Sequence, residues 1–268
     1  MRLLSLSLLV LTLFSPLGSA QTHDSTSSNA QDRTLIELFT SQSCSSCPKA
    51  EKLFAELADR DDLVVIEWHV DYWNNLVHGR DGRWQDPYSS QANTIRQRDY
   101  NLALRGTAGV YTPQAVISGV TETTGSRGAA IENLLSNAPE TCAKIEMSYD
   151  TAGLAVSIAP TPDVDVMEAE VMLVELIASA SNEIHGGENR GLTAHSRNIA
   201  ISNDSLGAWT GAAETYRARK VDDNRTCAIV VQEKGTGRIL GAEYCPTAAS
   251  MGLDPDESLA PSFTDAHP

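Results

Sequence analysis

The first half of the chain alternates between two patterns of apolar residues. Short apolar runs at 34–39, 63–70, 115–118 and 120–123 predict β-strands. Segments at 48–59, 89–104 and 129–135 carry apolar residues three and four positions apart, which predicts helices. Alternating strands and helices are typical of a small α/β fold. We therefore expect an α/β N-terminal domain over residues 34–142.

The second half of the chain lacks this helical spacing. Strand-like runs follow one another at 145–149, 154–158, 169–178, 195–200, 228–232 and 238–244. A succession of strands with turns between them is typical of two packed antiparallel sheets. We therefore expect an all-β, sandwich-like C-terminal domain over residues 143–246.

The two ends of the chain differ from these regions. Arg2, an apolar run and a small-residue ending at Ala20 predict a signal peptide over residues 1–20. Residues 21–33 are predicted to be a flexible lead-in, and residues 247–268 a disordered tail. The apolar run is too short to span a membrane. We expect an exported protein, periplasmic or secreted, of 268 − 20 = 248 residues.

The net charge of the chain limits the classes of molecule that it is expected to bind. The formal net charge is −15, and it becomes −16 once Arg2, the one charged residue of the first twenty, is removed. A surface this acidic argues against nucleic acids and anionic membranes as partners, because both carry negative charge.

The candidate chemistry lies in the motif Cys44-Ser45-Ser46-Cys47, between a predicted strand and a predicted helix. Unpaired N–H groups and the helix dipole favour a thiolate at such a position, and Lys49 adds positive charge nearby. Such surroundings lower a cysteine pKa from about 8.5 to roughly 3.5–7.5. Cys44 is therefore predicted to attack, and Cys47 to resolve, in a thiol–disulfide exchange.

Two alternatives remain for this cysteine pair. It could be a permanently closed structural disulfide, or half of a metal site. A zinc site usually has a second Cys or His pair at similar spacing, and the chain holds no second CxxC and no HxxxH motif. Redox chemistry is therefore the leading interpretation, and we expect no bound metal and no cofactor.

Two of the remaining cysteines lie at opposite ends of a predicted hairpin. A turn centred on Thr236 would place Cys227 directly across from Cys245. We predict a structural disulfide between them, with two buried free thiols as the alternative. Cys142 is then left over, and we expect it to be buried and inert.

The order strand, CxxC, helix, followed by Tyr111-Thr112-Pro113 before a later strand, resembles the thioredoxin fold. This resemblance implies that Thr112–Pro113 is a cis peptide bond that packs against the dithiol. It also implies that the backbone there holds an extended substrate segment beside the cysteines. Tyr111 and Thr112 are therefore expected to bind the substrate, and Pro113 joins the cysteines in the catalytic set. Trp73 is a further substrate-binding candidate, because it belongs to a dense group of aromatic residues that could line a groove for an unfolded substrate; packing of a long loop onto the sheet is the alternative.

A longer set of motifs resembles one family of exported bacterial proteins, domain of unknown function 1223. The motifs are residues 35–42 before the CxxC-Pro, residues 69–73, residues 110–114, residues 188–191 and His195. This family resembles thioredoxins in its first half and has an all-β second half. The chain departs from the family pattern at Ser43, at Lys49 and in a longer segment over residues 74–83.

Three acidic or basic residues are candidates to support the cysteines. Glu37, on the first strand, could exchange a proton with Cys47, or it could be a strand carboxylate paired with Arg or Lys. His69 and Asp71 fall on one face at the end of the second strand, and could form a hydrogen-bonded pair near the site. A structural pair that caps the strand is the alternative.

The leading hypothesis is thus an exported thioredoxin-like thiol–disulfide oxidoreductase. Its partners would be a thiol or disulfide protein substrate and a second redox protein. The alternatives are a non-catalytic binding module with a closed CxxC disulfide, and a periplasmic copper-handling protein that uses His69 with Cys44 and Cys47. The sequence leaves the redox direction open.

Overall fold

The computed structural model describes residues 32–76, 82–160, 168–222 and 224–247. The expected signal peptide, nearly all of the expected lead-in and the expected tail from residue 248 lie outside these ranges. The elements are β1 Thr34–Thr40, α1 Pro48–Leu57, β2 Leu63–His69, α2 Gln91–Arg105, β3 Gln114–Ile117, β4 Thr121–Thr124, α3 Gly128–Ser136, β5 Ile145–Asp150, β6 Gly153–Ile158, β7 Ala169–Glu183, β8 Thr193–Trp209, β9 Glu214–Ala218, β10 Thr226–Glu233 and β11 Ile239–Tyr244.

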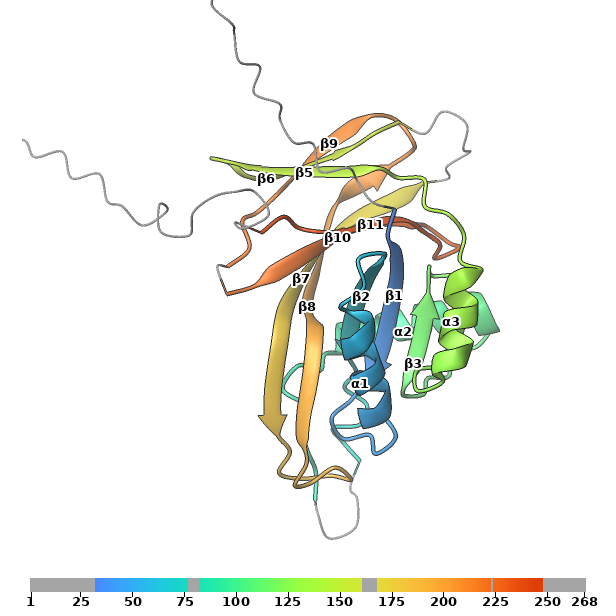
Figure 1. The fold of residues 1–268 in the computed structure, drawn as a ribbon, viewed down its shortest axis with the longest axis vertical. Helices are drawn as coiled ribbons and strands as arrows, with labels where there is room; N and C mark the ends of the chain where they lie inside the picture. The colour runs from blue at the N-terminus through green and yellow to red at the C-terminus, as the bar shows by residue number, and fades with distance from the viewer. Residues whose placement is uncertain (1–31, 77–81, 161–167, 223, 248–268) are drawn as a thin grey trace, which may run out of the picture.

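One large mixed sheet organises the molecule (Figure 1). Its eight strands run in the order β11-β10-β7-β8-β2-β1-β3-β4. Strand β1 pairs in parallel with β2 and antiparallel with β3, and β8 joins β2 through a parallel bridge between Glu67 and Ile199. The fold is therefore mixed α/β, with a large sheet and few helices among the described residues.

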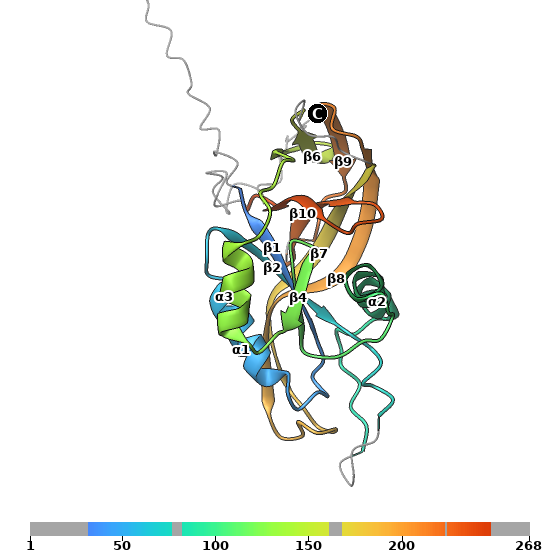
Figure 2. The ribbon, with the colours of Figure 1, turned by 90° about the vertical axis from the view of Figure 1, so that its right-hand side faces the viewer.

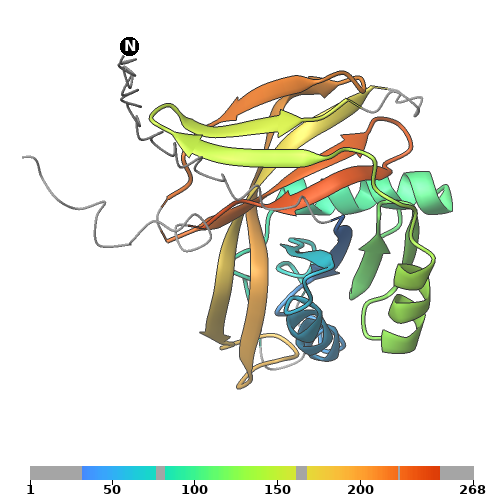
Figure 3. The same cartoon turned by 45° about the horizontal axis from the view of Figure 1, so that its top comes forward.

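The eight-stranded sheet contains strands from both sides of the expected domain boundary near residue 142. Four strands of the second half, β7, β8, β10 and β11, extend the sheet of the first half instead of forming a separate pair of sheets. The other three, β5, β6 and β9, form a small antiparallel sheet that packs over β7 and β10 (Figure 3). Both arrangements bury alternate residues of the same strands, so the apolar pattern alone did not distinguish them.

Helices cover both faces of the part of the sheet that is formed by β1 to β4, with α1 and α3 on one face and α2 on the other (Figure 2). Side chains of β1 alternate, so Ile36 and Leu38 pack against α1 and α3, whereas Leu35 and Phe39 pack on the side of α2. Within the described residues, no helix combines the length and apolar character needed to cross a membrane.

Helix ends follow local sequence signals. Pro48 opens α1, where the missing N–H costs little. The Ser90 side chain accepts a hydrogen bond from the Asn93 N–H at the start of α2, and Gly106, at φ +68°, ends that helix.

The hairpin β7–β8 is longer than its apolar pattern predicts. Its strands have 15 and 17 residues, because they continue as a largely exposed ribbon beyond the buried part of the sheet. The ribbon runs beside α1, where Arg197 donates to the Ala55 carbonyl at 3.2 Å (Figure 1). Residues 184–192, which we call the hairpin tip, therefore reach the end of the molecule at which α1 begins.

The edge strand β11 curves back and contacts β1 and β2. The Tyr244 hydroxyl accepts from the Val65 N–H at 2.8 Å and donates to the Val65 carbonyl at 3.1 Å. Gly119 has φ +69°, and a Cβ there would lie 1.9 Å from the Gly237 carbonyl oxygen, so only glycine fits this approach.

The Cys227–Cys245 disulfide is confirmed at the open end of the β10–β11 hairpin, where the Cys245 N–H also donates to the Cys227 carbonyl. Both cysteines are buried. Cys142 is free and only partly buried, and desolvation raises the pKa of its thiol.

Replacing Cys227 and Cys245 together by alanine should lower the free energy of unfolding by about 3 kcal/mol, because the unfolded chain loses an 18-residue loop closure. Urea unfolding with and without the disulfide measures this change. Cys142→Ala is the matched control and should have a much smaller effect, and an equal loss in both variants would contradict the assignment.

Candidate functional site

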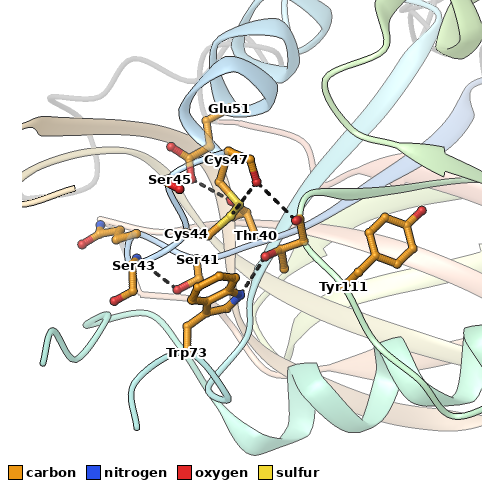
Figure 4. The surroundings of a disulfide bond; sticks show 12 residues. Thr40, Ser41, Ser43, Cys44, Ser45, Cys47, Glu51, Trp73 and Tyr111 are labelled. Carbon is orange, nitrogen blue, oxygen red and sulfur yellow. Dashed lines mark hydrogen bonds between the residues drawn. A yellow bond between two sulfur atoms is a disulfide. The ribbon is translucent and has the colours of Figure 1, made fainter. Parts of the chain in front are cut away.

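Cys44 and Cys47 form a disulfide at the junction between β1 and α1 (Figure 4). The connection is a tight turn, in which the Cys47 N–H donates to the Cys44 carbonyl at 3.1 Å. The Cys47 carbonyl then accepts from Ala50 and Glu51 N–H groups, which starts the helix. Both cysteines are fully buried in this oxidised state, while Ser45 and Ser46 between them are exposed.

The loop before β3 forms one wall of the site. The Thr112–Pro113 peptide bond is cis, as the resemblance implied. The Ser46 hydroxyl lies 3.3 Å from the Cys44 sulfur and 3.5 Å from the Thr112 carbonyl oxygen. The Trp73 indole N–H donates to the Thr112 hydroxyl at 2.7 Å. Both cysteines, Thr112 and Trp73 are thus brought together.

Tyr111, the other expected substrate-binding residue, is directed elsewhere. Its hydroxyl donates to the Glu122 carboxylate on β4, and the guanidinium of Arg105 lies over its ring. Figure 4 places its side chain away from the disulfide. These contacts give Tyr111 a structural position beside the site.

Glu37 lies on the opposite face of the sheet from the disulfide. It is fully buried, and its carboxylate accepts hydrogen bonds from the Arg96 guanidinium and the Trp68 indole N–H, both at 2.8 Å, and from the Tyr100 hydroxyl at 2.5 Å. Odd-numbered residues of β1 face α2, whereas α1 packs on the even-numbered ones. The structure therefore matches the alternative given for Glu37, a strand carboxylate with an arginine partner.

Glu51 is the buried acid that the structure does bring beside the dithiol (Figure 4). It lies one helical turn after Cys47, and its carboxylate accepts from the Thr40 hydroxyl at 2.7 Å. Desolvation, reinforced by the nearby charge of Glu67, raises the pKa of Glu51 from 4.5 to about 7. The sequence contained a signal for this residue, because positions four apart on a helix share a face.

His69 has an acidic partner, but it is Asp86 and not Asp71. The His69 Nδ1 lies 2.7 Å from the Asp86 carboxylate, which also accepts from the Gln42 N–H at 2.8 Å. Asp71 instead accepts from the Thr94 hydroxyl at 2.6 Å. The expected pair of His69 and Asp71 is therefore wrong, because the chain bends after β2 and a loop residue fills the place beside the imidazole.

His69 and its acidic neighbours are buried, and their pKa values are shifted by burial and by one another. Burial acts to lower the pKa of His69, but Asp86 and Glu67 outweigh it and raise the pKa to about 10. His69 Nε2 lies 3.8 Å from the Glu67 carboxylate, whose own pKa is raised by complete burial. Four buried side chains therefore lie near the cysteine pair on the α1 side of the sheet. We call them the acid cluster, and they are Glu51, Glu67, His69 and Asp86.

The arrangement of these side chains does not favour a copper or zinc site. Across the ranges the structure describes, no three His, Cys, Asp or Glu side chains are grouped closely enough to hold a metal ion. His69 already has Asp86 and Glu67 as its neighbours. Its expected use with the two cysteines as a copper site therefore lacks the geometry.

The hairpin tip contacts the loop that carries Cys44. The Asn189 side-chain amide donates to the Gln42 and Cys44 carbonyls, each at 2.9 Å, and the Ser45 N–H donates to the Glu188 carboxylate at 3.1 Å. These residues were noted in the sequence only as part of a family resemblance.

Residues 35–232 match a family described as protein of unknown function (DUF1223). The chain belongs to this family. A protein from Agrobacterium tumefaciens with a known crystal structure has 25% sequence identity to this DUF1223 chain. The two structures superpose with a TM-score of 0.66, and the match covers 80% of this chain and 94% of the other.

A second solved structure shares the fold alone. HBP35 of Porphyromonas gingivalis is 12% identical, with a TM-score of 0.55 over 89% of the DUF1223 chain and 80% of its own. The comparison with curated proteins found no match.

The raised pKa of Glu51 should make the stability of this DUF1223 protein depend on pH. Because the folded state holds this proton more tightly than the unfolded chain, stability should fall as pH rises from about 4.5 to about 7, by up to roughly 3 kcal/mol. Glu51→Gln should flatten this part of the curve, as measured by urea unfolding at several pH values. Glu56→Gln, on the exposed face of the same helix, is the control, and a Glu51→Gln curve as steep as wild type would contradict the assignment.

Proposed function

We propose that this DUF1223 protein is an exported thiol–disulfide oxidoreductase that acts through Cys44 and Cys47. The observation that carries the proposal is the Cys44–Cys47 disulfide at the start of α1, with the buried carboxyl group of Glu51 one turn further along the same helix. A dithiol at a helix N-terminus is suited to thiolate chemistry, and a carboxyl group with a pKa of about 7 can exchange a proton at neutral pH.

The arrangement of the first half supports a thioredoxin-like domain over residues 34–142. Strand order β2-β1-β3-β4, helices on both faces and a cis-proline before β3 are similar to the thioredoxin fold. The strands of residues 143–246 would then be an extension of this domain that continues its sheet and adds a sandwich-like layer.

Export is proposed from residues 1–20 together with the disulfides. A signal-peptide pattern and a buried second disulfide, Cys227–Cys245, suit an oxidising compartment such as the periplasm or the outside of the cell.

The reaction would proceed in two exchange steps. In the reduced protein the Cys44 thiolate attacks a disulfide of a partner protein, forms a mixed disulfide and releases one partner thiolate. Cys47 then passes its proton to Glu51 and attacks the Cys44 sulfur, which releases the second partner thiolate and closes the Cys44–Cys47 disulfide. Two electrons pass from the dithiol to the partner, and a second redox protein must return them. Microscopic reversibility allows the same residues to work in the opposite direction.

A second candidate function rests on the burial of the site. Cys44 and Cys47 have no exposed surface, which favours a closed structural disulfide in a binding module. The two candidates differ in the reduction potential of this pair.

The deciding measurement is that potential, obtained by tagging free thiols after equilibration in graded redox buffers. An oxidoreductase should give a reversible transition between about −120 and −270 mV. Cys47→Ser should in addition accumulate mixed disulfides with partner proteins through Cys44, because the resolving thiol is gone.

The control for trapping is Cys44→Ser/Cys47→Ser, which should form none of these adducts. If the wild-type pair stays closed below roughly −300 mV and Cys47→Ser traps nothing, the binding module is the correct function.

Glu51→Gln should slow closure of the Cys44–Cys47 disulfide by about tenfold or more at pH 7, because Cys47 loses its proton acceptor. The rate should also lose its inflection near pH 7. Stopped-flow measurement of the mixed-disulfide decay provides both results.

Glu37→Gln is the matched comparison for this step. It removes the negative charge that pairs with Arg96 on the opposite face, so it should lower stability and leave the inflection in place. An inflection that disappears in Glu37→Gln and persists in Glu51→Gln would exchange the two roles.

A further inference from the structure

The hairpin tip is anchored to the backbone groups that surround Cys44. Asn189 is 4% exposed, and its single side-chain nitrogen donates to the Gln42 and Cys44 carbonyls. Glu188 accepts from the next N–H, that of Ser45. Three backbone groups of the loop that carries Cys44 are thus bound by two neighbouring side chains that lie more than 140 positions away in the chain.

The backbone of the tip also packs on this loop. Gly186 and Gly187 are buried, and a Cβ on Gly187 would lie 3.5 Å from the Ser43 hydroxyl oxygen and 3.4 Å from the Trp84 Cβ. Gly187 has φ +72° and Gly191 φ +85°, conformations that glycine adopts without strain. The tip therefore lies flat against the segment that holds the fully buried Cys44.

The groups that the tip occupies are those an extended polypeptide could use. Two carbonyl oxygens, of Gln42 and Cys44, require N–H donors, and the Ser45 N–H requires an oxygen acceptor. Asn189 and Glu188 supply this set from side chains, whereas a strand of a partner protein supplies it from its backbone. The tip and such a strand would exclude each other.

We propose that Glu188 and Asn189 determine which partners react with Cys44, because the hairpin tip covers the dithiol until an extended polypeptide replaces its hydrogen bonds. This inference rests on the proposed function. A small thiol cannot replace the lost hydrogen bonds and reacts only when the tip opens on its own. A polypeptide thiol offsets the loss with its own backbone groups, so it reacts faster.

The test compares two thiols of the same chemistry on the oxidised, full-length mature protein. One is N-acetylcysteine amide, and the other is a ten-residue peptide with one central cysteine. In each reaction the thiolate attacks the Cys44 sulfur, the Cys44–Cys47 bond breaks, and the Cys47 thiolate leaves. Iodoacetamide then alkylates the released Cys47, and mass spectrometry follows the product with time.

Asn189→Ala should raise the rate with N-acetylcysteine amide by about tenfold, since two hydrogen bonds, each with a few-fold effect on the closed state, are lost. The rate advantage of the peptide over the small thiol should shrink by a similar factor. Ser181→Ala is the matched control, because it removes a hydrogen bond to His195 on the exposed ribbon of the same hairpin and should leave both rates unchanged.

Variants of Glu188 distinguish the effect of its hydrogen bond with the Ser45 N–H from the effect of its negative charge. Glu188→Gln keeps an oxygen for the Ser45 N–H and should react like wild type, whereas Glu188→Ala should react a few-fold faster with the small thiol. Because Glu188 is exposed, these variants also test the inference if Asn189→Ala does not fold.

The failures of the two proposals are distinguishable. A wild-type potential between about −120 and −270 mV, with small-thiol rates unchanged in Asn189→Ala and Glu188→Ala, overturns the covering role and leaves the oxidoreductase in place. A pair that stays closed below roughly −300 mV in wild type and variants overturns the oxidoreductase, and partner selection with it.

Discussion

The structure depends on the burial of both faces of its two central strands. Every residue of β2 is buried, and so is every residue of β1 after Thr34. Any ionisable side chain on these strands therefore needs a partner, because an isolated buried charge is costly. Glu37 meets this need with Arg96 on the α2 side, and His69 meets it with Asp86 on the α1 side.

The acid cluster gives the dithiol its electrostatic surroundings. Positive His69 lies between Asp86 and Glu67, and burial together with the nearby charge of Glu67 raises the pKa of Glu51 to about 7. A group that changes protonation near neutral pH, one helical turn after Cys47, is the kind of proton acceptor that disulfide exchange requires. The same groups link stability to pH.

The second half of the chain takes part in the site because it shares the sheet. A separate domain would be joined to the first only by a linker, whereas here β8 pairs with β2 and the ribbon follows α1 down to the disulfide. Asn189 can therefore bind the Cys44 carbonyl from 145 positions away. Sheet continuity, and not sequence proximity, places the hairpin tip on the loop that carries Cys44.

The sequence by itself determined the strands and helices of the first half, the CxxC motif at the start of α1 and the Cys227–Cys245 pair, because all of these depend on apolar periodicity or on a short hairpin register. Only the tertiary structure decided that Glu51 and not Glu37 adjoins the dithiol, and that Asp86 and not Asp71 pairs with His69. Periodicity shows which residues share a face of one element, but it does not show what another segment packs against that face. Contacts between distant segments depend on the packing of the whole chain, so the hairpin tip over Cys44 had no local signal.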